Sequence, residues 1–195
     1  MKDSSKTSME TPGDIGPSKL DEEGPESEPP QRLSLEVVIE SGDWAAAGDL
    51  NALVSGVAEV VAAATELAPR FRTPATACIA FTGDAAVRAL NAQYRGQDKA
   101  TNVLSFPAPP PPRGHRSDGE PMFLGDVALA AETVAAEARE QAIPFTHHVR
   151  HLVVHGVLHL LGHDHETDSE AEIMEALETR LLADLGVPDP YRSNG

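Results

Sequence analysis

The sequence of 195 residues is 41% hydrophobic and carries a formal net charge of −16 at pH 7. Its length favours one domain with an extension, because domains commonly contain ~100–200 residues. A single cysteine, Cys78, excludes a disulfide within the chain, and no run approaches the ~20 apolar residues of a membrane span. We therefore expect a soluble, cytoplasmic protein with no membrane partner.

Charge is distributed unevenly along the chain. The segment 70–116 contains seven basic residues and two acidic ones, whereas the segment 164–184 contains eight acidic residues and one basic one. The overall negative charge disfavours a nucleic-acid partner, but a polarised chain can still present a basic surface to phosphate. The same pattern is consistent with solvated charges that have no partner.

Residues 1–31 are rich in Ser, Pro, Gly and Glu and contain few aliphatic side chains. Such a segment cannot bury enough apolar surface to offset the entropy lost on ordering. We predict a disordered acidic tail over 1–31 that takes no part in the chemistry, followed by one domain over 32–195.

Strands and helices are both expected along this domain. The residue pattern predicts a strand at 33–40, a helix over 50–67 capped by Asp49, a strand at 75–81 and a helix over 84–94 capped by Asp84. An extended piece at 101–106 precedes a proline-rich loop that starts at 107, and a fourth strand follows at 123–129. Helices are expected over 131–142 and 144–161.

The last predicted helix covers 170–185 and opens with a capping box formed by Ser169 and Glu172. Its apolar stripe would consist of Ile173, Leu177, Leu181 and Leu185. Together the elements predict a single α+β domain, with a small mixed four-stranded sheet covered by about five helices. A metal site would lie on a helix and the turn after it.

The most informative stretch of the chain reads His155-Gly-Val-Leu-His159-Leu-Leu-Gly-His-Asp-His165. His155 and His159 are four residues apart and therefore share one helix face. Gly162 is suited to end the helix in the left-handed conformation, and the returning chain would bring His165 toward the pair. Three imidazoles with a fourth position open suit a catalytic zinc ion. The alternative is a histidine-rich helix without metal, but burying two neutral imidazoles without partners is costly.

The spacing of these histidines also matches the H-E-x-x-H-x-x-G-x-x-H pattern of the metzincin zinc proteases. Those enzymes use the glutamate after the first histidine as their general base. Here that position is Gly156, which has no proton-accepting side chain. The metal-binding pattern is protease-like but the base is missing, which argues against peptide hydrolysis.

The histidine stretch resembles the H-G-x-L-H-L-x-G-[YH]-D-H signature of the YbeY endoribonucleases, also called rRNA maturation factors. A second block is similar to that family's L-N-x-x-Y-R-x-x-D-x-x-T-[DN]-V-L-S-F-P; it reads Leu90-Asn-Ala-Gln-Tyr94-Arg95-Gly-Gln-Asp98-Lys-Ala-Thr101-Asn102-Val-Leu-Ser105-Phe-Pro107. Leu124-Gly125-Asp126 matches the family's L-G-D strand, and the likeness spans about 33–191. Two departures are His163, where tyrosine is common, and Ala100, where proline is common.

The resemblance implies a function and roles for four residues. His155, His159 and His165 would bind one Zn²⁺ per chain, and Arg95 would be the basic residue on which activity depends. The implied reaction is zinc-dependent cleavage of single-stranded RNA, in 3′-end maturation of the small-subunit (16S) rRNA precursor and in ribosome quality control. The ribosomal small subunit or ribosome-assembly proteins would be partners.

Physical chemistry gives Arg95 two possible roles. Its guanidinium suits a bidentate contact with phosphate. A surface arginine at a helix end is also favoured by the helix dipole alone. No general base is evident, and the candidates for a base, or for a residue that orients a metal ligand, are Asp126, His163 and Asp164. Asp164 would either orient a metal-bound imidazole or simply complete the turn.

Three polar residues of the second block, Thr101, Asn102 and Ser105, would either contact the substrate or satisfy backbone groups of their loop. The other histidines of the helix are interpreted as surface or packing residues: His147, His148 and His151. Two other functions remain consistent with the sequence. One is a metal-dependent hydrolase of another bond, and the other is a ribosome-associated binding protein whose zinc is structural.

Overall fold

The computed structural model describes residues 32–71, 73–110 and 120–192. The tail predicted over 1–31 lies outside the described residues, as does most of the proline-rich loop. Within the described ranges the chain forms four strands and five α-helices, in the order that the sequence predicted.

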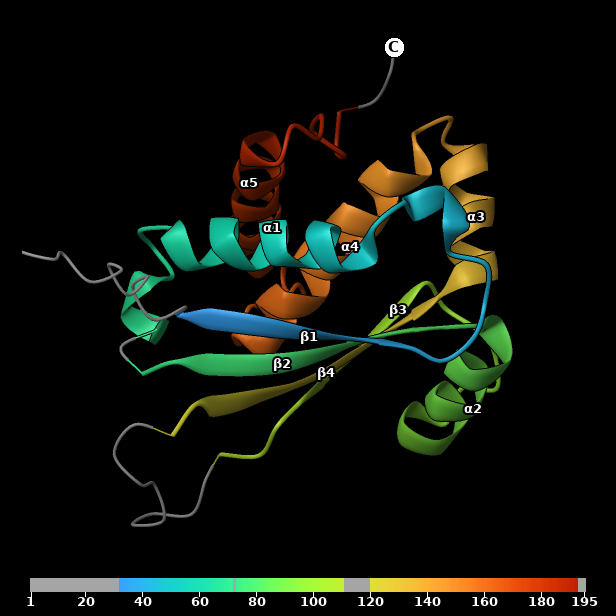
Figure 1. The fold of residues 1–195 in the computed structure, drawn as a ribbon, viewed down its shortest axis with the longest axis horizontal. Coiled ribbons are helices and arrows are strands. Elements are labelled where there is room, and N and C mark those ends of the chain that lie inside the picture. Colours follow the sequence, from blue (N-terminus) through green and yellow to red (C-terminus); the bar gives the residue numbers. More distant parts are fainter. Residues whose placement is uncertain (1–31, 72, 111–119, 193–195) are drawn as a thin grey trace, which may run out of the picture.

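One mixed sheet, with strand order β1-β2-β4-β3, supports the whole domain (Figure 1). Strands β1 (Leu33–Ile39), β2 (Ala75–Thr82) and β4 (Met122–Ala130) run parallel, while β3 (Val103–Pro107) pairs antiparallel with β4. The parallel and antiparallel pairings together make the sheet mixed, which confirms the predicted α+β class.

The helices are divided between the two faces of this sheet (Figure 1). Helices α1 (Leu50–Ala63) and α4 (Phe145–Leu160) cover one face, and α5 (Asp168–Asp184) packs against α4. Helix α2 (Asp84–Arg95) contacts β3 and β4 from the opposite face, and α3 (Ala131–Glu140) follows β4 directly. Short 3₁₀ turns lie at Ala45–Ala47 and Ala68–Phe71. None of these helices in the described ranges is both long and apolar enough to cross a membrane.

Helix α4 is the central element of the core. It contacts β3, β4, α1, α3 and α5, and its aliphatic residues Val149, Val153 and Val157 are fully buried. His155 and His159 lie at the edge of this buried surface, with side chains 22% and 21% exposed. The packing that stabilises the domain therefore also fixes the backbone of these two histidines.

The ends of α1 and α2 differ from the predictions. Helix α1 ends at Ala63, because Ala64 takes an extended conformation and the following turn lets Leu67 bury its side chain. The cap of α2 is Gly83 rather than Asp84. Asp84 Oδ1 instead accepts hydrogen bonds from the backbone N–H and the hydroxyl of Thr133, at 3.0 and 2.9 Å, and so caps the start of α3.

Helix α5 starts two residues earlier than predicted. Its capping box consists of Thr167 and Glu170, not Ser169 and Glu172. The predicted apolar stripe was also wrong at one end, because Ile173 is 59% exposed. The buried face of α5 is rotated by about one residue and consists of Met174, Leu177, Glu178, Leu181 and Leu182.

Candidate metal centre

One turn of helix α4 and the chain reversal after it bring the three predicted histidines together. His155 and His159 lie one helical turn apart on α4, with their Nε2 atoms 3.0 Å from each other. Gly162 then reverses the chain with φ +83°, and the N–H of His163 bonds to the carbonyl of Leu158 at 3.0 Å. In the returning chain, the ring centroid of His165 lies 5.5 Å from the ring centroid of His155 and 5.0 Å from that of His159.

This donor set fits a zinc ion. One ligand atom from each of the three imidazoles lies within 4.8 Å of the others. Two nitrogens that each bind a tetrahedral zinc at ~2.0–2.1 Å are about 3.3 Å apart, close to the observed separation of His155 and His159. Burial, followed by the neighbouring His155 and His165, lowers the pKa of His159 and so favours the neutral ring that a metal requires.

A carboxylate lies behind the first histidine. Glu178 on α5 is fully buried, and its Oε1 lies 2.7 Å from Nδ1 of His155. Its Oε2 lies 3.3 Å from Nε2 of His151 and accepts a hydrogen bond from the hydroxyl of Tyr191. Burial alone would raise the pKa of Glu178, but the hydrogen bonds from His151, His155 and Tyr191 outweigh it and hold the pKa at about 2.

The three histidines open into a cavity of about 710 Å³. Arg95, the last residue of α2, lines the same cavity and donates from Nη2 to the carbonyl oxygen of Ser105 at 3.4 Å. The structure thus places a guanidinium and three imidazoles around one space, although Arg95 and His165 are 70 residues apart in the sequence. Other predicted site residues that line it are Thr101, Asn102, Ser105, His163 and Asp164.

The polar residues of the second block already have protein partners. Asn102 donates from Nδ2 to Glu137 at 2.9 Å, and its Oδ1 accepts from the N–H of Val103 at 2.7 Å. The hydroxyl of Ser105 donates to the carbonyl of Gly156 at 3.3 Å, and that of Thr101 to Asn102 Oδ1 at 3.4 Å. Asn102 thus satisfies a neighbouring backbone N–H, whereas Ser105 bonds to a carbonyl of α4 and Thr101 bonds to a side chain.

The three candidates for a base are placed differently. Asp164 accepts a hydrogen bond from the N–H of His165 at 2.8 Å, and its Oδ1 lies 3.9 Å from Nδ1 of His159. His163 lines the cavity, and burial followed by the charge of Arg70 lowers its pKa. Asp126 lies outside this cavity and lines a different one, beside Glu40 and Tyr94.

The location of Asp126 follows from the alternation of side chains along β4. Its neighbour Val127 is fully buried beneath α4, next to Gly156. Successive side chains of a strand point to opposite faces, so Asp126 points away from the histidines. The structure therefore contradicts the inclusion of Asp126 among the candidates for a base at this centre.

With this geometry established, comparison with known proteins assigns a family. A family model described as "Endoribonuclease YbeY" matches residues 39–186. The chain belongs to this family. The endoribonuclease YbeY of Rhodopseudomonas palustris (strain HaA2) is 47% identical over 180 residues, covering 91% of this chain and 90% of the relative. That of Chelativorans sp. (strain BNC1) is 48% identical over 172 residues, covering 87% and 98%.

A solved structure supports the fold of this family member. The solution structure of TM1509 from Thermotoga maritima aligns with a TM-score of 0.50 and 22% sequence identity, covering 82% of this chain and 99% of that one. At this identity the likeness concerns the fold alone.

Sequence reasoning missed Glu178, Tyr191 and His151 in this family member. His151, interpreted as a surface or packing residue, forms with His155 and Glu178 a second group of donors within 4.8 Å. The available signal was in α5: Glu178 follows Leu177 and precedes Leu181 by three residues, so it lies on the apolar face. A glutamate in that position needs a buried partner.

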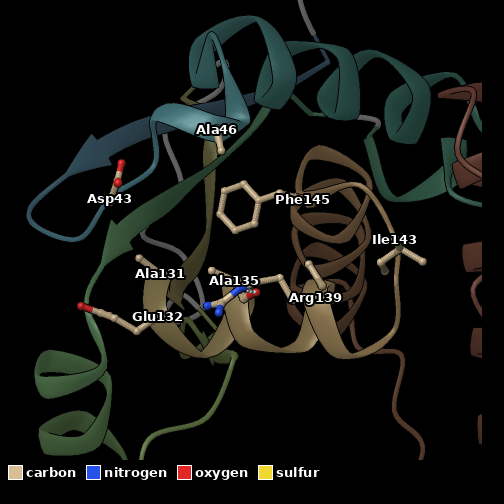
Figure 2. Close-up of a pocket in the computed structure, with 9 residues that line it drawn as sticks. Asp43, Ala46, Ala131, Glu132, Ala135, Arg139, Ile143 and Phe145 are labelled. Carbon is tan, nitrogen blue, oxygen red and sulfur yellow. Dashed lines mark hydrogen bonds between the residues drawn. The ribbon is translucent and has the colours of Figure 1, made fainter.

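A separate cavity of about 460 Å³ lies between α3 and the first turn of α4 (Figure 2). The ring of Phe145 points into it, and Ala46, Ala131 and Ala135 supply much of its wall. Its lining is mainly aliphatic, with Arg139 along α3, and none of the predicted site residues lines it.

Proposed function

We propose that this chain is a zinc-dependent endoribonuclease that cleaves single-stranded RNA. The observation that carries the proposal is the cavity that His155, His159 and His165 share with Arg95. The relatives at 47–48% identity named endoribonuclease YbeY support the reaction class. The three imidazoles would hold one Zn²⁺ and leave a position open.

The roles of the residues follow from the charge that develops on a phosphodiester. A bound zinc ion would polarise a phosphate oxygen or lower the pKa of a water to about 7. Arg95 would bind the non-bridging oxygens through its guanidinium and fix the phosphate beside the histidines. The bond from Arg95 to the carbonyl of Ser105 already directs that side chain to the cavity. His163 and Asp164, which line the same cavity, are the candidates for moving the proton.

The first experiment compares cleavage of a labelled single-stranded RNA with cleavage of the same RNA annealed to its complement. We expect zinc-loaded protein to cut the single strand, and a chelator, His159→Ala or His165→Ala to abolish cutting. Arg95→Ala should lower the rate by about 100-fold, as for the loss of a donor to developing charge, while zinc affinity stays unchanged.

Arg88→Ala is the matched control for Arg95→Ala. Arg88 lies on the same helix but is paired with Asp98 through Nε at 2.6 Å and Nη2 at 2.9 Å. Its removal takes the same charge from α2 and should leave cleavage intact. Equal losses in the two variants would mean that net charge, rather than the position of Arg95, drives activity.

The same measurements separate the two other functions. A structural zinc predicts that chelation unfolds the domain, and that intact protein binds small-subunit components without cutting them. A hydrolase of another bond predicts turnover of a peptide or ester by the zinc-loaded protein.

We further propose a cytoplasmic role in 3′-end maturation of 16S rRNA and in ribosome quality control, with the small subunit or its assembly proteins as partners. Membership of the endoribonuclease YbeY family supports the cleavage reaction that this role requires, and the motif resemblance implies the rRNA substrate. Cells depleted of the protein should accumulate 16S rRNA with unprocessed 3′ ends. Wild type should restore processing and His159→Ala should not.

A further inference from the structure

We propose that Glu178 is a positioning residue, which fixes the ring of His155 so that its Nε2 atom faces the metal position. The proposal rests on the zinc site of the proposed function. The structural basis is the hydrogen bond between Glu178 and the far side of the His155 ring.

Glu178 can perform this role because its position is itself fixed. The side chain is fully buried on the face of α5 that packs against α4, and both of its oxygens have partners. Oε1 lies 2.7 Å from Nδ1 of His155, while Oε2 accepts hydrogen bonds from Nε2 of His151 and from the Tyr191 hydroxyl. A carboxylate held by several hydrogen bonds in a buried site keeps one orientation.

The consequence for His155 is a defined tautomer. A carboxylate oxygen only accepts, so the proton of the ring belongs on Nδ1, next to Glu178. Nε2 then carries the free lone pair and lies 3.0 Å from Nε2 of His159, on the side of the cavity. Metal-bound histidines commonly donate their second nitrogen to a carboxylate in this way.

His155 differs from the other two ligands in this respect. The nearest carboxylate to His159 belongs to Asp164, which is 52% exposed and 3.9 Å from Nδ1, beyond hydrogen-bond range. His165 lies on the exposed turn after α4. Among the described residues, Glu178 is thus the buried carboxylate that contacts a ligand, and we expect His155 to be the ligand with the most restricted ring.

Tyr191 extends this support to the turn that follows α5. Its hydroxyl donates to Glu178, and its backbone N–H donates to Asp189 at 2.9 Å. Asp189 also accepts from the hydroxyl of Thr179 at 3.4 Å, which ties the turn to the helix. The phenol therefore stabilises Glu178 without contacting the metal position, and its loss should produce a weaker effect in the same direction.

The test measures zinc affinity by competition with a chelator, using the full chain. Glu178→Gln keeps the size of the side chain but replaces one acceptor oxygen with a donor group. We expect its zinc dissociation constant to rise by about 10- to 100-fold, the usual effect of losing such a partner. Glu175→Gln, an exposed acid on the same helix, removes the same charge and should bind zinc as wild type does.

A second readout does not depend on metal or on activity. Two-bond ¹H–¹⁵N spectra of the metal-free protein at pH 8 report which ring nitrogen carries the proton. We expect His155 to carry it on Nδ1 in wild type, with an added Nε2-protonated population in Glu178→Gln. If Glu178→Gln does not fold, Tyr191→Phe replaces it, with a smaller loss of affinity and the same direction of tautomer change.

Three results would overturn the proposal. The first is wild-type His155 protonated on Nε2, and the second is Glu178→Gln with unchanged zinc affinity. The third is binding of two zinc ions per chain with the second lost in Glu178→Gln, since His151, His155 and Glu178 would then be ligands themselves. Absence of RNA cleavage by zinc-loaded wild type would instead contradict the proposed function and leave the tautomer result standing.

Discussion

Replacing Gly156 with alanine tests how closely α4 packs on the sheet. A Cβ atom at this position would lie 2.6 Å from Cγ1 and 3.0 Å from Cγ2 of Val127, and 3.3 Å from the hydroxyl of Ser105. Carbon atoms in contact normally lie ~3.5–4.0 Å apart. Val127 is fully buried on β4, so the helix or the strand must shift to admit the methyl group.

The magnitude follows from two opposing effects. Overpacking a dense core costs ~1–3 kcal/mol, while alanine in place of glycine within a helix gains ~1 kcal/mol. We therefore expect Gly156→Ala to lower the free energy of unfolding by ~0–2 kcal/mol. Gly56→Ala in α1 is the matched control, because its nearest neighbour would be Cδ2 of Leu185 at 3.8 Å, an ordinary contact. The free energy of unfolding of Gly56→Ala should therefore rise by the full ~1 kcal/mol.

Urea unfolding in a chelating buffer measures the free energy of unfolding of wild type and of both variants. The two variants should differ by ~1–3 kcal/mol, which isolates the overpacking cost since both receive the same gain in helix propensity. In a Val127→Ala background, where the clashing methyl groups are gone, Gly156→Ala should cost less than in wild type. Equal stabilisation by Gly156→Ala and Gly56→Ala would refute the close approach of α4 to β4.

Three further substitutions test other contacts. Thr167→Ala removes the capping box of α5, and Asp84→Ala removes the cap that α2 supplies to α3; each should cost ~1 kcal/mol in the same urea assay. Burial lowers the pKa of His148 below its ordinary value of 6.5, against the opposing effect of Glu137. Between the lowered pKa and 6.5 the unfolded chain binds more protons, so stability should fall with falling pH by at most about 1.4 kcal/mol per pH unit. His148→Gln should remove this pH dependence of stability. Identical profiles of stability against pH for wild type and His148→Gln would contradict the assignment to His148.

Features that depend on local spacing could be predicted from the sequence. The 3.6-residue period places His155 and His159 on one face of α4, and Gly162 has the positive φ that the turn toward His165 requires. The strands and helices were identified in the correct order, because their apolar periods and the glycines and prolines between them are local signals. Errors at helix ends remained small, as for Asp84 and the first turn of α5.

Features that depend on contacts between distant segments could not be predicted. Glu178 lies 23 residues after His155, and the contact exists because α5 packs against α4. The predicted stripe shared Leu177 and Leu181 with the buried face but began at Ile173 instead of Met174, and it did not include Glu178. Asp126 was included for the opposite reason: its motif suggested function, but the strand's alternation directs it to the other face of the sheet.

The packing of α4 also accounts for the glycine where the protease pattern has glutamate. The Cβ position of residue 156 is closed by Val127, so a longer side chain would have to enter the core between α4 and β4. An ionised carboxylate buried there without a partner would cost several kcal/mol. The separation between helix and sheet thus excludes a base at this position while it holds His155 and His159 at the edge of the cavity. If the proposed cleavage needs a general base, residue 156 cannot supply it, and other titratable side chains that line the cavity are those of His163, Asp164 and Glu166.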